Sequence, residues 1–382
     1  MTATLGAAVT TGLASYFVRR VITPDTPVDD LTVVAVTSDA ITLTATAEST
    51  EPGRYGLWQN GFQTHARLGE VLTADEHHVV RRIDGIDRGI LRPGPARLNG
   101  YYFCGPPTTS PGLDLHEVMI DGAAGPMPAW CGQVPGDRWA VLVHGRGALR
   151  AEGLRAVPTL QRLGISCLLP SYRNDVDAPA SEDRLYHLGL TEWQDIEAAI
   201  RYAADHGARE VQLFGWSMGG AVVLQTLDRS ALAAHVSRVV LDAPVLDWQR
   251  VMDFHAKQNR LPRRVGRYGQ WMLRSPARGP LTGVADVVDV RETDWLTKAV
   301  QLTTPTLVIH SRVDEFVPYE PSALLAQTRP DLVQLATWES GRHCREWNVD
   351  SQRWEDLVAD FCGPPQPPVH AAPVSPGSAN DR

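Results

Sequence analysis

The stretch LFGWSMGG, residues 213–220, places a serine between glycines directly after a short apolar run. The residues VQLF before the first glycine have the composition of a buried strand, and AVVLQTL after the last has that of a helix. A serine at such a junction stands clear of both elements if the residues two before and two after it are small. Gly215 and Gly219 meet this condition. The stretch predicts a nucleophilic Ser217, against the alternative of an ordinary glycine-rich turn.

Segments on both sides of this stretch alternate between two patterns. Short runs rich in Val, Leu and Ile indicate strands buried on both faces, at residues 139–145, 165–172, 210–217, 236–244, 304–314 and 332–340. Residues 154–164 and 192–208 show apolar spacing near 3.6, and Gly207 marks the end of the second helix. The alternation predicts a mostly parallel sheet with right-handed crossovers, flanked by helices.

The remaining segments predict additions to this α/β region, which spans residues 114–362. Residues 23–113 contain short alternating runs between Gly and Pro clusters and predict a β-rich extension. The segment 247–300 is longer than a normal crossover connection between parallel strands, which predicts an inserted cap. The apolar residues 1–22 predict a short packed helix or a marginal membrane anchor, and the Pro-rich residues 363–382 a disordered tail.

Composition excludes several classes of function. The net charge of -8 gives no general attraction for nucleic acid, and no zinc-finger or nucleotide-fold motif is present. The five cysteines form no CxxC or Cys/His zinc pattern, which predicts free thiols and a reducing, cytoplasmic location. Association with a membrane surface through the N-terminal segment stays open, and the oligomeric state is not predicted.

A serine that transfers acyl groups also needs an oxyanion hole, a base and an acid that orients the base. The run HGRG at 144–147 ends a strand two strands before Ser217, so backbone amides near Arg146 and at Met218 are predicted to bind the oxyanion. Asp314 follows a strand end and is the predicted acid. His343 lies in a loop after the last strand and is the predicted base.

Other residues were weighed for the same roles. Asp242 and Asp247 follow an earlier strand and are the reserve acids. His310 lies inside a strand and is predicted to be a core histidine, and Glu315 to point away from the base. Cys344 is adjacent to His343 but is predicted to be a packing residue.

With HGRG, GWSMGG, Asp314 and His343 in this order, the chain resembles the α/β-hydrolase superfamily of serine hydrolases. The segment PSYRND at 170–175 is similar to the lysophospholipase-like and serine-aminopeptidase-like branch. The resemblance implies the α/β-hydrolase fold and structural roles for Tyr172 and Arg173.

The expected activity is metal-independent and cofactor-free hydrolysis of an ester, thioester or amide through an acyl-enzyme, with ester cleavage favoured over peptide cleavage. Alternatives on the same residues are a peptidase, a C–C bond hydrolase and an acyltransferase; a non-catalytic binding protein is the alternative of another class. The expected substrate is a small acyl ester or lipid-like molecule, and the residues predicted to contact it are Gly145, Trp216 and Trp271. The cap is also rich in arginine between residues 260 and 278.

Overall fold

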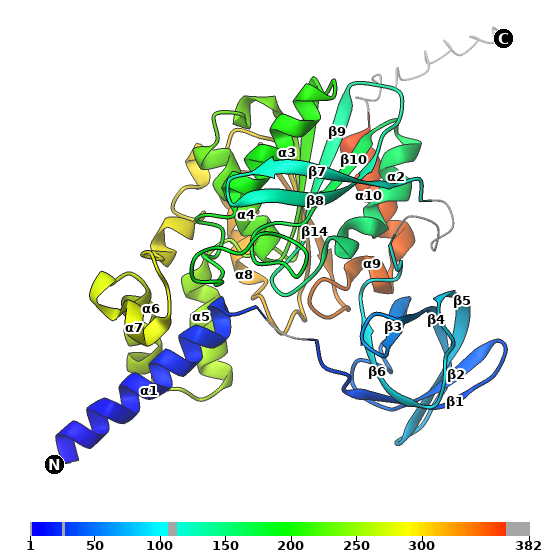
Figure 1. The fold of residues 1–382 in the computed structure, drawn as a ribbon, viewed down its shortest axis with the longest axis horizontal. Coiled ribbons are helices and arrows are strands. Elements are labelled where there is room, and N and C mark those ends of the chain that lie inside the picture. Colours follow the sequence, from blue (N-terminus) through cyan, green and yellow to red (C-terminus); the bar gives the residue numbers. More distant parts are fainter. Residues whose placement is uncertain (1, 25–26, 106–112, 364–382) are drawn as a thin grey trace, which may run out of the picture.

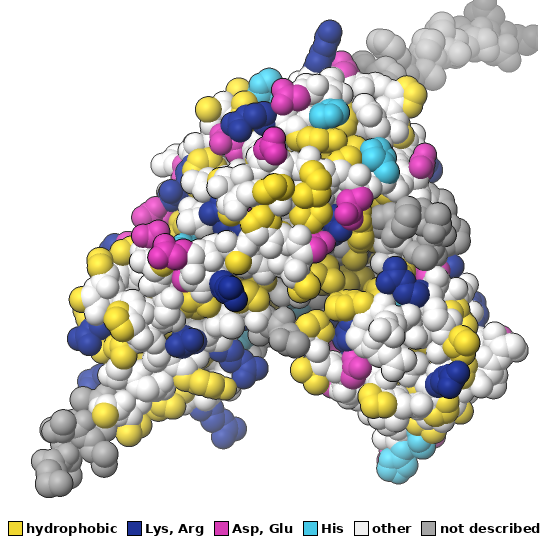
Figure 2. Space-filling model, in the orientation of Figure 1, with side chains coloured by type: hydrophobic (Ala, Val, Ile, Leu, Met, Phe, Trp, Pro, Cys, Tyr) yellow, Lys and Arg dark blue, Asp and Glu magenta, His cyan; other side chains and the backbone are white. Residues whose placement is uncertain are grey.

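The computed structural model describes residues 2–24, 27–105 and 113–363. It contains a closed six-stranded barrel, an eight-stranded sheet with helices on both faces, and a group of helices beside the carboxyl edge of that sheet (Figure 1). In the space-filling view the barrel and the helical group project from the sheet region as two separate lobes (Figure 2). The predicted disordered tail lies outside the described residues.

The large sheet has the strand order β14-β13-β12-β11-β9-β10-β8-β7. Strands β9 to β14 pair in parallel, and β7 and β8 add an antiparallel edge next to β10. The predicted α/β fold with a mostly parallel sheet is therefore confirmed. The bounds are β7 His116–Gly122, β8 Gly125–Gly132, β9 Arg138–Val143, β10 Ser166–Pro170, β11 Glu210–Trp216, β12 Val236–Asp242, β13 Thr306–Ser311 and β14 Val333–Trp338.

Two hydrophobic clusters cover the faces of this sheet. One contains α3 (Trp193–Asp205) and α4 (Met218–Arg229), and the other contains α2 (Val157–Arg162) and α10 (Ser351–Cys362). Successive residues of a strand face opposite ways, so Val141 packs in the first cluster and Leu142 in the second. Helix α3 ends just before Gly207, whose φ of 97° is the left-handed conformation that commonly ends a helix.

The predicted β-rich extension contains a closed barrel, β1-β2-β5-β4-β3-β6. Its inward side chains, among them Val33, Leu43 and Leu57, form a core of their own. Buried Arg81 donates to the carbonyls of Ser49 and Glu51 and so holds the loop between β2 and β3. The bounds are β1 Leu31–Val36, β2 Ala40–Thr44, β3 Tyr55–Gln59, β4 Thr64–Ala74, β5 His78–Arg88 and β6 Gly94–Asn99.

The helical group combines the N-terminal helix with the insertion after β12. Helix α1 (Thr2–Ile22) packs on α6 (Arg263–Leu273), and a Cβ built on Gly269 would lie 2.7 Å from Val18 Cγ2, so the glycine permits this close approach. The group also contains α5 (Trp248–Gln258) and α7 (Gly279–Thr282). Within the described residues, no helix combines the length and apolar character needed to cross a membrane.

The α/β region also contains two further helices and a 3₁₀ turn. Helix α8 (Glu320–Thr328) follows β13, and α9 (Glu346–Val349) follows β14. A 3₁₀ turn at Arg150–Ala156 precedes α2. All five cysteines are buried free thiols.

Candidate active site

Ser217 lies at a sharp turn between β11 and α4. Its φ of 53° and ψ of -117° are unusual for a residue with a side chain. A Cβ on Gly215 would lie 2.6 Å from the Gly219 carbonyl oxygen, and a Cβ on Gly219 would lie 2.1 Å from that of Val143. Both positions therefore require glycine. The Ser217 amide donates to the Asp242 carbonyl at 3.0 Å, which holds the strained turn against β12.

The three predicted reactive side chains form one hydrogen-bonded chain. His343 Nδ1 lies 2.7 Å from Asp314 Oδ2, and His343 Nε2 lies 2.8 Å from Ser217 Oγ. A carboxylate only accepts, so Nδ1 carries the proton and Nε2 is left to accept from the serine hydroxyl. Ser217, Asp314 and His343 follow β11, β13 and β14, which are parallel strands and end at the same edge of the sheet.

The loop after β13 holds the Asp314 carboxylate in place. Its Oδ1 accepts from the amides of Phe316 and Val317 at 2.7 and 2.8 Å, and its Oδ2 also lies 3.2 Å from His310 Nε2. His310 is fully buried, as predicted for a core histidine, and it contacts the acid as well. The carboxylate is thus fixed on both oxygens.

Electrostatic interactions shift the pKa values of His343 and Asp314 in opposite directions. Burial by itself would lower the pKa of His343, but the charge and hydrogen bond of Asp314 outweigh it, and the pKa lies above its usual value. Burial by itself would raise the pKa of Asp314, but the His343 charge and the hydrogen bonds from His310 and His343 hold this pKa well below its usual range. The pair therefore favours an imidazolium beside a carboxylate, the state that forms when His343 takes a proton.

The reserve candidates are engaged elsewhere. Asp247 caps α5 by accepting from the Gln249 amide, and Asp242 Oδ2 accepts from the Trp354 indole at 2.8 Å. Glu315 accepts from the His343 backbone amide at 3.2 Å, so it holds the loop rather than the imidazole. Cys344 is 4% exposed, and burial raises the pKa of its thiol well above the usual value.

The predicted oxyanion donors lie on two elements beside Ser217. Met218 is the first residue of α4, so its amide has no hydrogen-bond partner within the helix. The amide lies at the positive end of the helix dipole, which favours a negative charge. A Cβ on Gly145 would lie 3.0 Å from Ser217 Cβ, which places the HGRG loop against the serine. The Gly145 amide itself donates to Glu152 Oε2 at 2.8 Å. Within this loop, the amide of Arg146 thus stays the predicted donor.

Glu152 is a residue that the sequence did not single out. It is 6% exposed, lies in the 3₁₀ turn after the HGRG loop, and its charge helps to raise the pKa of His343. Arg155 of the same turn lies 3.4 Å from Glu152 and donates to the Cys344 carbonyl at 2.8 Å. The turn connects the HGRG loop to the histidine loop. In the sequence, the glutamate in RAEGLR (residues 150–155) carries no local signal of this role.

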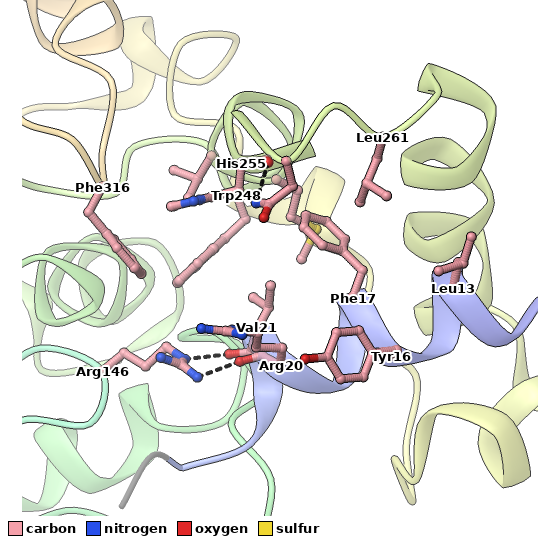
Figure 3. Close-up of a pocket in the computed structure, with 13 residues that line it drawn as sticks. Leu13, Tyr16, Phe17, Arg20, Val21, Arg146, Trp248, His255, Leu261 and Phe316 are labelled. Carbon is pink, nitrogen blue, oxygen red and sulfur yellow. Dashed lines mark hydrogen bonds between the residues drawn. The ribbon is translucent and has the colours of Figure 1, made fainter. Parts of the chain in front are cut away.

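A cavity of about 420 Å³ opens beside these residues, between α1 and α5 (Figure 3). Its wall includes Arg146 from the HGRG loop and Phe316, whose ring centroid lies 5.1 Å from that of His343. The cavity therefore adjoins the Ser217 site. The other lining residues are Leu13, Tyr16, Phe17, Arg20, Val21, Trp248, Val251, Met252, His255, Asn259 and Leu261.

The N-terminal helix is tied to the predicted oxyanion loop. The Arg146 guanidinium donates to the carbonyls of Arg20 and Val21 at the end of α1 (Figure 3). It also donates to the carbonyl of Thr23, just after the helix. These carbonyls have no partners within the helix, and the negative end of the helix dipole favours a cation there. The position of α1 and that of the HGRG loop are thus coupled.

Two of the predicted substrate contacts, Trp216 and Trp271, lie outside the wall of this cavity. The indole of Trp216 is 1% exposed and packs with Phe214 on the α2 and α10 face, because alternation along β11 turns it away from the cavity. Trp271 packs beside Tyr268 and under Arg278 within the helical group, and it does not line the cavity. Gly145 alone of the three lies against Ser217.

The cap does supply lining residues, but from α5. Trp248, Met252 and His255 recur at helical spacing and face the cavity together. His255 Nε2 is buried without a hydrogen-bond partner among the described residues, and burial lowers the pKa of His255. The spacing of these residues was the sequence signal that could have found this face.

The barrel contacts the loop that carries His343. Glu51 Oε1 accepts from the Arg342 amide at 2.9 Å, and Glu48 Oε1 lies 2.9 Å from Arg345 Nη2. Both glutamates lie in the loop between β2 and β3 that Arg81 holds. The histidine thus sits between two residues that the barrel binds.

We expect the double variant Glu48→Gln/Glu51→Gln to lower kcat by roughly tenfold with little change in KM, because a displaced base loses alignment with Ser217. Steady-state kinetics on a soluble ester measure this effect. Glu70→Gln breaks a barrel ion pair with Arg82 instead and is the matched control. Equal kinetics for both variants would show that the barrel contacts do not position the histidine.

Comparisons with known proteins agree with this architecture. Residues 140–371, more than half of the chain, match the family described as the alpha/beta hydrolase family. Residues 32–99, which form most of the barrel, match a domain of unknown function, DUF8805. Among curated proteins, none matches the chain.

Similar solved structures include the esterase Pf2001 of Pyrococcus furiosus in two crystal forms. The first is 18% identical, with 65% of this chain and 90% of that chain covered and a TM-score of 0.51. The second is 17% identical, with 65% and 91% covered and a TM-score of 0.50. At these identities the likeness is one of fold, and the lysophospholipase-like branch stays a prediction. The family match and the shared fold identify this chain as a member of the alpha/beta hydrolase family.

Proposed function

We propose that this protein is a serine hydrolase that cleaves carboxylic esters of apolar acyl groups through an acyl-enzyme. The observation that carries the proposal is the hydrogen-bonded chain from Ser217 through His343 to Asp314, beside an apolar cavity. Membership of the alpha/beta hydrolase family and the similar fold of the Pyrococcus furiosus esterase support the same reaction class.

Each group has one role in the proposed mechanism. Ser217 Oγ attacks the ester carbonyl while His343 Nε2 takes its proton, and Asp314 stabilises the resulting imidazolium. The amides of Met218 and Arg146 donate to the oxyanion. His343 then protonates the leaving alcohol, and a water activated by the same imidazole releases the acid.

The cavity favours the acyl side of an apolar ester. Phe17, Trp248 and Met252 supply hydrophobic surface, and the cavity continues from Phe316, which packs near His343. An acyl chain there removes apolar area from water, which contributes about 0.8 kcal/mol per methylene. Among the lining residues, His255 Nε2 is buried without a hydrogen-bond partner in the described part of the chain, so it can pair with a polar group of the substrate.

The proposal is tested with purified protein and a panel of p-nitrophenyl esters of graded length, beside aminoacyl-naphthylamides. We expect turnover of the esters and a single fluorophosphonate adduct on Ser217. Faster turnover of the naphthylamides would favour a peptidase. Product analysis with an added alcohol separates hydrolysis from acyl transfer.

Chain-length preference tests the cavity. We expect Leu261→Trp to lower kcat/KM for an octanoyl ester relative to an acetyl ester by roughly tenfold, because the indole takes the space of several methylenes. Trp271→Ala is the control, since Trp271 lies outside the cavity wall, and its chain-length profile should run parallel to that of the parent. A changed profile in Trp271→Ala alone would place the acyl site elsewhere in the cap.

A further inference from the structure

Helix α1 leaves a row of large apolar side chains uncovered. Val9, Leu13 and Tyr16 are 55%, 43% and 65% exposed. Their spacing of four and three residues puts them on one face of the helix. The opposite face, with Ala14 and Val18, is buried against the rest of the molecule. The exposed row is therefore a continuous apolar strip and not the packed side of the helix.

Basic side chains are concentrated on α6, which packs on α1, and on the neighbouring α5. The helices α5 and α6 and the turn between them carry exposed Lys257, Arg260, Arg263, Arg264, Arg267 and Arg274, and no Asp or Glu occurs from residue 254 to 285. Within the described part of the chain, none of these cations lies within ion-pair distance of a carboxylate. In Figure 2 the lobe that contains α1 shows hydrophobic side chains with Lys and Arg beside them. The whole chain is acidic, so this basic surface is a local feature.

The same face borders the cavity. Leu13 and Tyr16 belong to the exposed row and also line the cavity (Figure 3). Exposed Arg20 lines the cavity as well. A surface that covered the strip would therefore meet the cavity mouth. An apolar row on one helix with basic helices next to it matches the boundary between acyl chains and anionic headgroups of a bilayer.

We propose that the face formed by α1, α5 and α6 docks on an anionic lipid bilayer and that the cavity receives an acyl chain from it. The second half of this statement rests on the proposed ester hydrolysis, and the first half does not. A second copy of the chain fits less well, because a two-fold contact through this face would bring the same unpaired cations together.

The test is co-sedimentation of the full chain with vesicles of phosphatidylcholine alone or in equal mixture with phosphatidylglycerol. We expect binding to the mixed vesicles that weakens as salt is raised. The variant Arg263→Gln/Arg264→Gln/Arg267→Gln should bind at least about tenfold more weakly. Val9→Asp should also weaken binding, including at a salt concentration where the charge contribution is screened.

The matched control is Arg162→Gln/Arg201→Gln/Arg209→Gln, which removes three exposed arginines outside this face. Control and test variants should hydrolyse a soluble acetyl ester at the parent rate, because none of the substituted residues lines the cavity or contacts Ser217.

Three results would overturn the docking face. They are an absence of binding to mixed vesicles at low salt, equal binding by the two triple variants, and a dimer in solution that Val9→Asp dissociates. Vesicle binding without hydrolysis of any soluble ester would leave the docking face standing and refute the proposed ester hydrolysis.

Discussion

Ser217→Ala is expected to abolish fluorophosphonate labelling and to lower kcat for a soluble ester by about 10⁴-fold or more, since no nucleophile remains in reach of His343. The fold should persist, because Ala fits wherever Ser217 fits and the turn is held by backbone bonds to Asp242 and Val245. Intact-protein mass spectrometry after labelling and a thermal melt measure the two outcomes.

The thiol of Cys344, close to His343, gives the matched control for the Ser217→Ala experiment. Cys344 Sγ lies 3.6 Å from His343 Nε2, and Cys344→Ala should keep the fluorophosphonate adduct because the buried thiol stays protonated. If Ser217→Ala still accepts the probe, or if Cys344→Ala loses it, the nucleophile has been assigned to the wrong side chain.

Asp314→Asn is expected to lower kcat by roughly 10³ to 10⁴-fold while the free energy of unfolding changes by about 1 kcal/mol. An amide at this position donates to Nδ1, so the imidazole takes the wrong tautomer for accepting the Ser217 proton. Asp247→Asn is the control, because Asp247 caps α5 and does not contact the imidazole. If Asp247→Asn lowers kcat and Asp314→Asn does not, the acid that orients His343 lies after β12 and not after β13.

The pH profile of the same variant supplies a second measurement. The base must be neutral to act, so kcat/KM rises as pH passes upward through the pKa of His343. Asp314 raises that pKa, and its loss should therefore move the rising limb of the residual activity to lower pH. A limb that stays in place would show that the titrating group is not His343.

The sequence by itself was sufficient for the strand–turn–helix around Ser217 and for the parallel strands that frame it. The turn itself requires glycine at 215, where a Cβ would meet the Gly219 carbonyl oxygen, and the close approach of β9 requires it at 219, where a Cβ would meet the Val143 carbonyl oxygen. Asp314 and His343 could be predicted because parallel strands bring their carboxyl ends to one edge wherever the connections run. These inferences needed only neighbours in sequence and the direction of the strands.

The tertiary structure decided which side chains surround that edge. In the sequence, Trp216 and Trp271 are equally good aromatic candidates for a substrate contact. Strand alternation buries Trp216 on the α2 and α10 face of the sheet, and helix packing holds Trp271 away from the cavity. Glu152, the two barrel glutamates and the row on α1 reach the site across gaps of tens to hundreds of residues in the chain. No local sequence pattern predicts these contacts, because they depend on how helices and strands that are distant in sequence pack together. The packing also determines which surfaces stay exposed.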